Sequence, residues 1–285
     1  MPIAHHTGRC KSGDLEIFYR RLGNRALTPI LFAHGLSYFS YDWLPIAAAL
    51  GTDRECVAVD LRGFGDSDRS PVKDYSVPSM AQDLANLLDH LAWKRAIVLG
   101  HSMGGRSTAY LAAKQPQRVA GLVLVDYSPD NAPAGSKRTA QAVAGTPEVF
   151  PSIEDGMKYF NSSAEKRERF KAYLKPVAGG YEVKRDPHFR NQFRKLLDTG
   201  ERPSIGVDMW QVLGELRCPI LSVRGTRSDM YAPETVAKMK AANPGLRVVE
   251  VDAGHNIGGE NPEGLIAVMK PFIAALEEKS HERTA

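Results

Sequence analysis

The chain has 285 residues, 43% of them hydrophobic, which is enough for one large folded unit around a well-buried core. Lysine and arginine outnumber aspartate and glutamate by 37 to 33, and the basic residues are interspersed with acidic ones, so no nucleic-acid-binding surface is predicted. The 3 cysteines lie far apart without a Cys-x-x-Cys pair, which favours free thiols in a reducing compartment over disulfides or a zinc site.

The start of the chain lacks the basic segment and apolar run of a signal peptide, and no later apolar stretch is long enough to span a membrane. We therefore expect a cytoplasmic protein that binds neither membrane nor nucleic acid and needs no cofactor or metal. His5 and His6 lie near the terminus without partner spacing, so a disordered tail is predicted there.

Short β-branched runs alternate with longer helix-like stretches, which is the pattern of a mainly parallel, buried sheet. An alternating run predicts an edge strand at residues 15–20. Further strands are predicted at residues 30–33, 56–60, 96–100, 122–126, 219–224 and 247–251. Helices are predicted at residues 80–93, with Ser79 as a cap, and at 104–115, 233–242 and 262–277.

The middle of the chain has a different composition. Between about residues 128 and 215 there is no apolar strand run, and charged residues, proline and glycine are frequent. Amphipathic helical patches occur at 164–174 and 189–197. Because the strand pattern resumes afterwards, we predict a core domain of residues 1–127 and 216–285, with residues 128–215 inserted as a helical cap.

A Gly-x-Ser-x-Gly motif, Gly100 to Gly104, follows a predicted strand and precedes a helix of small residues. This strand, turn and helix context is the one in which the motif lifts a serine hydroxyl above the edge of a sheet. Glycines are needed beside Ser102 because a neighbouring Cβ would collide with the strand or the helix. The N-terminus of the helix would then face a developing anion.

Two further segments support a serine hydrolase. His34 and Gly35 close an earlier strand, where a loop can offer the N–H of Leu36 as an oxyanion donor beside that of Met103. Late in the chain, His255 follows the last predicted strand.

Four segments together resemble the α/β-hydrolase superfamily over nearly the whole chain. They are His34-Gly35, residues 60–67 (DLRGFGDS), residues 100–105 (GHSMGG), and Gly254-His255 followed by residues 260–262 (ENP). The resemblance implies an eight-stranded, mostly parallel sheet with helices on both faces, an α-helical cap after strand six, and a catalytic triad. Ser102 would be the nucleophile.

His255 is the candidate general base, because a serine hydroxyl needs a neutral imidazole to remove its proton during attack. His34 and His101 are expected to shape the turns around the serine and to bond neighbouring loops. The triad also needs a carboxylate that holds the histidine in the correct tautomer. Asp126, at the end of a strand, is preferred, and Asp229, after the next strand, is the alternative.

The choice between the acids depends on register. Many family members carry the acid three residues after the glycine that ends strand seven, whereas here Ser228 occupies that position and Asp229 comes one residue later. Asp126 resembles relatives with the acid after strand six. Asp60 is expected only to bond the backbone of its own glycine-rich loop.

Aromatic residues after Gly35 suggest an apolar acyl pocket. The predicted pocket residues on this loop are Leu36, Tyr38, Phe39, Tyr41 and Trp43. Tyr127, Met209 and Trp210 are further candidates, although packing within the cap would explain them as well. Arg106 is a candidate contact for an acidic substrate or, equally, a surface residue.

The sequence thus predicts hydrolysis of a small carboxylic ester or lactone through an acyl-enzyme, with a small molecule as partner and a homodimer left open. Ser102 argues against epoxide hydrolases and haloalkane dehalogenases, whose nucleophile is an aspartate. Three alternatives remain: a carbon-carbon bond hydrolase of dienoic ring-cleavage products, a perhydrolase, and a non-catalytic small-molecule receptor that retains the triad.

Overall fold

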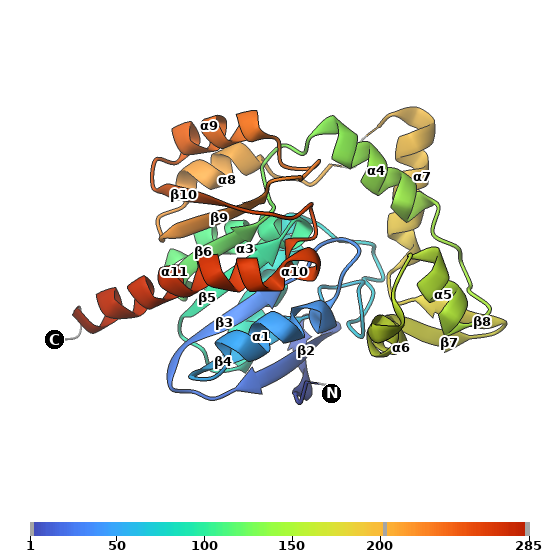
Figure 1. The fold of residues 1–285 in the computed structure, drawn as a ribbon, viewed down its shortest axis with the longest axis horizontal. Helices are drawn as coiled ribbons and strands as arrows, with labels where there is room; N and C mark the ends of the chain where they lie inside the picture. Colours follow the sequence, from blue (N-terminus) through green and yellow to red (C-terminus); the bar gives the residue numbers. More distant parts are fainter. Residues whose placement is uncertain (1–2, 202–203, 283–285) are drawn as a thin grey trace.

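The computed structural model describes residues 3–201 and 204–282 of the chain (Figure 1). Its centre is an eight-stranded sheet in the order β1-β2-β4-β3-β5-β6-β9-β10. The pairs β1-β2 and β2-β4 are antiparallel and all other neighbours are parallel. The strands are β1 (His6–Ser12), β2 (Leu15–Gly23), β3 (Leu27–Ala33), β4 (Arg54–Val59), β5 (Ala96–His101), β6 (Val119–Val125), β9 (Ile220–Gly225) and β10 (Leu246–Val251).

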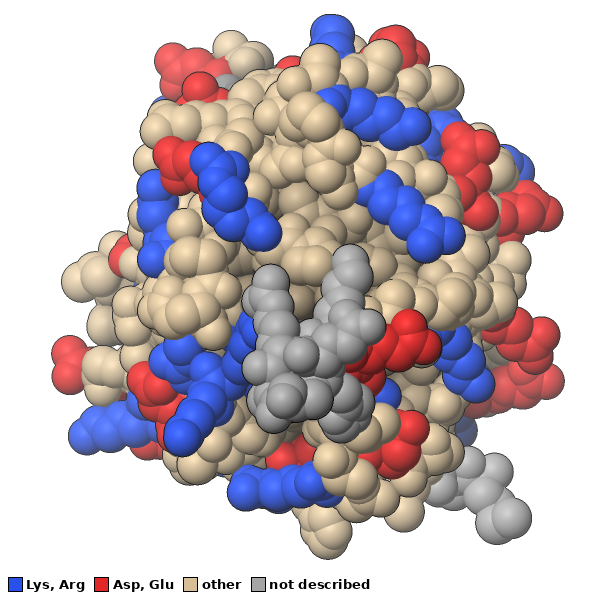
Figure 2. All heavy atoms as spheres, turned by 90° about the vertical axis from the view of Figure 1, so that its left-hand side faces the viewer, with Lys and Arg blue, Asp and Glu red and all other residues tan. Residues whose placement is uncertain are grey.

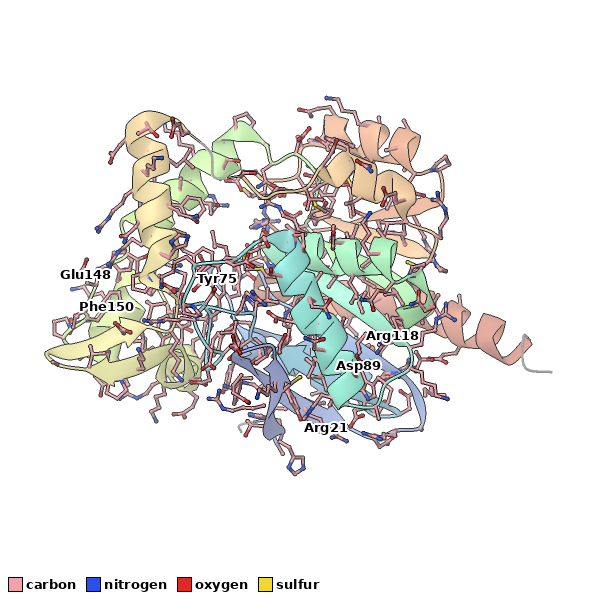
Figure 3. The ribbon with its side chains drawn as sticks, turned by 180° about the vertical axis from the view of Figure 1, so that it is seen from behind. Arg21, Tyr75, Asp89, Arg118, Glu148 and Phe150 are labelled. Atoms are coloured by element: carbon pink, nitrogen blue, oxygen red, sulfur yellow. The ribbon has the colours of Figure 1, made fainter. Side chains whose placement is uncertain are left out.

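Helices cover both faces of the sheet, as the resemblance implied. The face toward the viewer in Figure 1 carries α1 (Leu44–Leu50), α10 (Ile257–Glu260) and α11 (Pro262–Glu282). The face seen in Figure 3 carries α2 (Val77–His90), α3 (Met103–Lys114), α8 (Met209–Glu215) and α9 (Pro233–Ala242). Of two short 3-10 turns, η1 (Ser40–Trp43) precedes α1, and η2 (Pro116–Arg118) connects α3 to β6.

Alternation along each strand divides the core between the two faces. In β3, Ile30 and Phe32 pack with α1 and α11, whereas Leu31 and Ala33 pack with α2 and α3. All four side chains are fully buried. Because parallel strands are covered on both sides, such runs are continuously apolar, and each fully buried large side chain stabilises the fold by about 1.5–3 kcal/mol.

The segment between β6 and β9 leaves the sheet and returns to it. It contains α4 (Pro133–Ala144), α5 (Ile153–Tyr159), η3 (Ala164–Lys166), α6 (Arg167–Tyr173), α7 (Pro187–Thr199) and a hairpin of β7 (Leu174–Val177) and β8 (Gly180–Val183). The hairpin was not predicted, because its strands have only four residues each and each contains a charged residue together with a proline or a glycine. The last helix of the segment, α8, packs on α3 and α9 and so lies with the helices that cover the sheet.

The N-terminal predictions require two corrections. The strand predicted at the edge, β2, lies one place further in, because β1 pairs with it from Leu15 to Arg21. His5 and His6 do not form a disordered tail. His6 begins β1, and Nε2 of His5 lies 3.1 Å from Nη1 of Arg20. The mostly polar composition of β1 concealed a strand that is fixed by backbone pairing.

The start of α2 also differs from the prediction. The helix begins at Val77, and the hydroxyl oxygen of Ser76, rather than that of Ser79, accepts the capping hydrogen bond, from the amide of Ser79 at 3.4 Å. The hydroxyl of Ser79 donates instead to Asp74. None of the helices within residues 3–201 and 204–282 has the length and apolar composition needed to cross a bilayer.

Candidate active site

Ser102 lies at the sharp turn between β5 and α3. Its backbone has φ 51° and ψ −112°, in a region that residues other than glycine rarely adopt. The amide of Ser102 donates to the carbonyl oxygen of Val125 at 3.1 Å, and its carbonyl accepts from the amide of Gly105 at 2.9 Å. These bonds hold the strained turn, and strain of this kind is concentrated at functional sites.

The positions around Ser102 require glycine, because neighbouring atoms approach the backbone too closely for a Cβ atom. A Cβ on Gly100 would lie 2.3 Å from Oγ1 of Thr108, and one on Gly104 would lie 2.5 Å from the carbonyl oxygen of Ala33. A Cβ on Gly105 would lie 2.8 Å from Cβ of Tyr127. The helix after the nucleophile therefore packs directly against the neighbouring strands, as the motif predicts.

His255 is bonded to Asp126. Its Nδ1 lies 2.6 Å from Oδ2 of Asp126, whose side chain is completely buried at the end of β6. With a proton on Nδ1 donated to the carboxylate, Nε2 keeps a free lone pair and can accept a proton. Asp126 has φ 43°. The residues that directly follow two adjacent strands, Ser102 and Asp126, therefore both have a positive φ angle.

The Asp126 carboxylate has two further donors. The amide of Gly225 lies 2.8 Å from Oδ1, and Oγ of Ser228 lies 2.5 Å from Oδ2. No role was predicted for Ser228, although this residue occupies the usual position of the family acid. The structure thus places the Ser228 hydroxyl beside the carboxylate that bonds His255.

Asp229 has a different hydrogen-bond partner. Both of its oxygens accept from Arg138 of α4, from Nε at 2.6 Å and from Nη2 at 2.8 Å. These hydrogen bonds lower the pKa of Asp229. Asp229 bonds Arg138, and the His255 imidazole bonds Asp126.

His101 and His34 hold the loops, as the sequence predicted. Nε2 of His101 lies 2.9 Å from the carbonyl oxygen of His255, and the two rings are 4.7 Å apart. The amide of Leu61 donates to Nε2 of His34 at 3.0 Å, so the His34 proton lies on Nδ1, facing the carbonyl of Gly35 at 2.7 Å. Burial lowers the pKa of both histidines, that of His101 strongly, which keeps the rings neutral.

His101 joins the serine turn to the histidine loop, because it precedes Ser102 in the chain and bonds the backbone of His255. The hydroxyl of Ser102 makes no hydrogen bond to a described residue. Hydrogen bonds between a catalytic serine and its base often become short and well aligned only when substrate binds. Ser102 and His255 are both partly accessible, whereas Asp126 is buried.

The two predicted oxyanion donors are unpaired within the described residues. The amides of Leu36 and Met103 donate to none of them. Met103 is the first residue of α3, where the helix dipole favours negative charge. Leu36 lies in the turn closed by the amide of Tyr38 and the carbonyl of Gly35 at 3.1 Å. Both amides are therefore available to an oxygen anion.

The predicted pocket residues separate into two groups. Tyr38, Tyr41 and Trp43 line a cavity of about 540 Å³, whose other walls include residues of η3, α6 and α10. The other predicted residues do not line this cavity. Leu36 and Trp210 pack against the main core, and Phe39, Tyr127 and Met209 are buried.

Some of these residues have polar partners and some do not. Nε1 of Trp210 donates to Asp130 at 2.9 Å. The Tyr127 hydroxyl has no hydrogen-bond partner among the described residues, and burial raises its pKa. Arg106 is partly exposed. Asp60 accepts from the amides of Ser40 and Asp66, so it caps its own loop and a neighbouring one.

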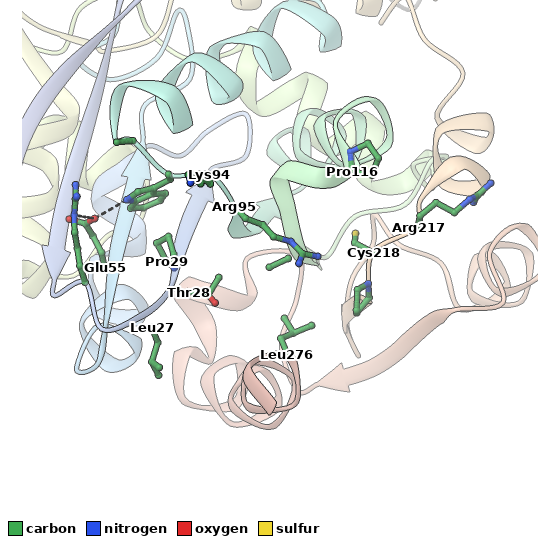
Figure 4. A pocket seen from close by; sticks show the side chains of 15 residues that line it. Leu27, Thr28, Pro29, Glu55, Lys94, Arg95, Pro116, Arg217, Cys218 and Leu276 are labelled. Atoms are coloured by element: carbon green, nitrogen blue, oxygen red, sulfur yellow. Dashed lines mark hydrogen bonds and ion pairs between the residues drawn. The ribbon is translucent and has the colours of Figure 1, made fainter. Parts of the chain in front are cut away.

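A larger hollow, of about 800 Å³, lies at the opposite end of the sheet, around the amino ends of β3, β5 and β9 (Figures 2 and 4). Its arginines donate to backbone carbonyls: Arg25 to Leu91 at 3.2 Å, Arg95 to Val119 at 3.3 Å, and Arg217 to Gly214 at 2.8 Å. They thus satisfy strand and helix ends, and this hollow contains none of the predicted catalytic residues.

Comparisons with known proteins agree with the fold. The family described as the alpha/beta hydrolase fold matches residues 28–262, so the chain belongs to this family. A 3-hydroxybutyrate-oligomer hydrolase of Cupriavidus necator is 33% identical over 261 residues, covering 86% of this chain and 88% of the relative. A 2-(acetamidomethylene)succinate hydrolase of Mesorhizobium japonicum is 30% identical over 275 residues, covering 94% of this chain and 95% of the relative.

A solved structure of an E-2-(acetamidomethylene)succinate hydrolase superposes with a TM-score of 0.82 at 26% identity, covering 95% of this chain and all of that one. The relatives are hydrolases, and the chain is an α/β hydrolase by sequence and by fold.

Proposed function

We propose that the protein hydrolyses a small carboxylic ester or lactone through an acyl-enzyme. The observation that carries this proposal is the hydrogen bond between His255 and Asp126. Asp126 follows β6, and Ser102 lies in a strained turn directly after the adjacent strand, β5. A buried carboxylate that fixes the Nδ1 proton leaves Nε2 as the proton acceptor, which is the requirement for activating a serine.

In the proposed reaction, Ser102 Oγ attacks the substrate carbonyl while Nε2 of His255 takes the hydroxyl proton. The amides of Leu36 and Met103 stabilise the oxyanion, and the proton passes to the departing alcohol oxygen. Water then attacks the acyl-enzyme by the same sequence, releasing the acid and restoring Ser102. Asp126 stabilises the imidazolium that forms in both halves.

The relatives support a hydrolytic function and the choice of ester. One is named as a hydrolase of 3-hydroxybutyrate oligomers, and an Escherichia coli relative that is 27% identical over 256 residues is named an esterase. We propose the division into residues 1–127 with 216–285 as core and 128–215 as cap, because this segment begins at the end of β6 and rejoins the sheet at β9. Its last helix, α8, packs on the core helices α3 and α9.

The test is a panel of esters, lactones, thioesters and dienoates offered to the wild type and to Ser102→Ala. We expect turnover of esters or lactones by the wild type, and loss of that turnover in Ser102→Ala by several orders of magnitude. Consumption of the dienoate alone would replace the proposal with carbon-carbon bond hydrolysis. A folded wild type that turns over no member of the panel would favour a receptor.

A further inference from the structure

The cavity of about 540 Å³ under the cap adjoins the proposed active site. Its inner wall contains the buried side chains of His34 and His101 together with Tyr38, and its outer rim contains exposed residues of η3 and α6. His101 immediately precedes Ser102, and the Tyr38 ring packs edge-on against the His101 ring at 5.1 Å. The cavity therefore reaches the residue that precedes the nucleophile, although Ser102 and His255 are not among the residues that line it.

Arg169 of α6 projects a fixed guanidinium into this cavity. Its Nε lies 2.5 Å from Oδ1 of Asp42, and its Nη2 lies 2.9 Å from Oδ2. Three aromatic rings surround the group, those of Phe39, Phe170 and Tyr173, with centroids 4.7 to 5.4 Å from the guanidinium carbon. Only 18% of the Arg169 side chain is exposed. Such a side chain is ordered before a ligand arrives.

Part of the hydrogen-bonding capacity of Arg169 is unused. The guanidinium has five N–H donors, of which the bidentate pair with Asp42 uses two. Nη1 donates to none of the described residues. A half-buried, pre-oriented donor on a cavity wall favours a ligand that supplies an acceptor, because an unmet donor is costly.

The charges around the cavity indicate whether the ligand's acceptor is charged or neutral. Asp42 balances Arg169, and at the rim Lys166 is accompanied by Glu165 and Glu168. The cavity thus has no excess of positive charge, and a ligand carboxylate would meet three acidic side chains. A neutral carbonyl or ester oxygen gains the hydrogen bond without that repulsion.

We propose that this cavity binds the distal part of an elongated ester substrate, and that Arg169 Nη1 donates a hydrogen bond to a neutral carbonyl oxygen beyond the scissile bond. The inference rests on the proposed esterase function and names its substrate class: esters whose acyl chain carries a second, uncharged oxygen acceptor. Arg169 is then a specificity residue as well as a clasp between the cap and η1.

The experiment measures the ratio of kcat/KM for a keto ester to kcat/KM for the unsubstituted ester of the same length. Nitrophenyl esters of keto acids, with the keto group at successive positions, are compared with unsubstituted esters of the same length and with esters ending in a carboxylate. For the wild type we expect the best keto ester to exceed its plain counterpart in kcat/KM by about tenfold or more. The carboxylate esters should show no such advantage.

Arg169→Met should bring this ratio close to one, and Arg169→Lys should retain part of it. Arg167→Met is the matched control, because Arg167 lies two residues earlier, is about half exposed and pairs with Glu154 outside the cavity. Asp42→Asn removes the balancing charge but keeps the guanidinium, so carboxylate esters should gain relative to plain ones. Circular dichroism establishes that each variant is folded.

The outcomes separate this inference from the proposed function. If Arg169 is only a clasp, its replacement lowers kcat/KM for all esters equally and leaves the ratio unchanged, which overturns the inference. A wild-type ratio near one while plain esters are hydrolysed overturns it as well, and leaves the esterase function standing. If no ester is hydrolysed at all and Ser102 is unreactive, both fail together.

Discussion

Ser228 and His255 share one oxygen of Asp126. Oδ2 of the carboxylate lies 2.5 Å from the Ser228 hydroxyl and 2.6 Å from Nδ1 of the imidazole. The Ser228 oxygen itself accepts from the amides of Met230 and Tyr231 at 3.2 and 3.1 Å. A hydroxyl whose lone pairs are occupied in this way must direct its proton to the carboxylate, so Ser228 fixes the oxygen that orients His255.

Replacing Ser228 by alanine should therefore lower kcat by about tenfold and leave KM nearly unchanged, because one hydrogen bond to a buried charge is lost. Steady-state kinetics on the best ester checks this. Ser222→Ala is a suitable control, since that hydroxyl is also buried but contacts Tyr231 at 3.3 Å instead of the acid. Equal effects of the two replacements would contradict a positioning role for Ser228.

The two candidate acids give opposite predictions. Asp126→Asn should lower kcat by roughly ten-thousandfold, because the amide can stabilise the wrong tautomer of His255 and cannot balance the imidazolium. Asp229→Asn should change kcat by less than about threefold, since its carboxylate bonds Arg138 on a partly exposed surface. Loss of activity in Asp229→Asn alone would reverse the assignment.

Short sequence motifs predicted more of this site than hydrophobic periodicity did. The apolar runs predict the central strands of the sheet, and the glycine, serine and histidine motifs that follow these runs predict the serine turn and the position of His255. The strand β1 and the hairpin β7-β8 were missed because backbone pairing fixes them, and their side chains carry little periodic signal. The bond between Arg169 and Asp42 joins residues 127 positions apart, a distance at which one sequence offers no signal.

The glycines of the turn can be tested by adding a methyl group. Gly104→Ala should destabilise the protein by about 3 kcal/mol or abolish folding, because the new Cβ would lie 2.5 Å from a backbone oxygen that cannot move aside. Gly214→Ala, in α8, meets nothing nearer than 3.6 Å and should be neutral or stabilising by up to about 1 kcal/mol. Urea unfolding of both variants measures the difference, and equal stabilities would contradict the packing described.

Attachment of the cap should depend on pH through Asp186. Burial alone would raise the pKa of this carboxyl, but hydrogen bonds from Tyr75, from the amide of His188 and from Lys73 lower it on balance. Figure 3 shows Tyr75 near α7, and its ring lies 4.6 Å from that of Phe189 in this helix. A carboxyl whose pKa is lower in the folded protein stabilises it above the ordinary value of 3.8, and this contribution disappears as the pH falls through the folded value.

Asp186→Asn should consequently cost about 2 kcal/mol at pH 7 and less at pH 3, because below 3.8 the unfolded wild-type chain takes up a proton at this carboxyl and the contribution of the charge begins to be lost. Thermal unfolding of both proteins between these pH values provides the measurement. The asparagine keeps an oxygen for the amide of His188, so the helix cap is preserved. A difference in Tm that stays constant over this range would show that the charge does not contribute.

The most direct test of the catalytic assignment is reaction of the wild-type protein with a fluorophosphonate, followed by mass spectrometry of its peptides. We predict a single adduct on Ser102, formed rapidly in the wild type and at a strongly reduced rate in His255→Ala, which lacks the proposed base. A correctly folded wild-type protein that carries no adduct, or carries it on another residue, would contradict the account.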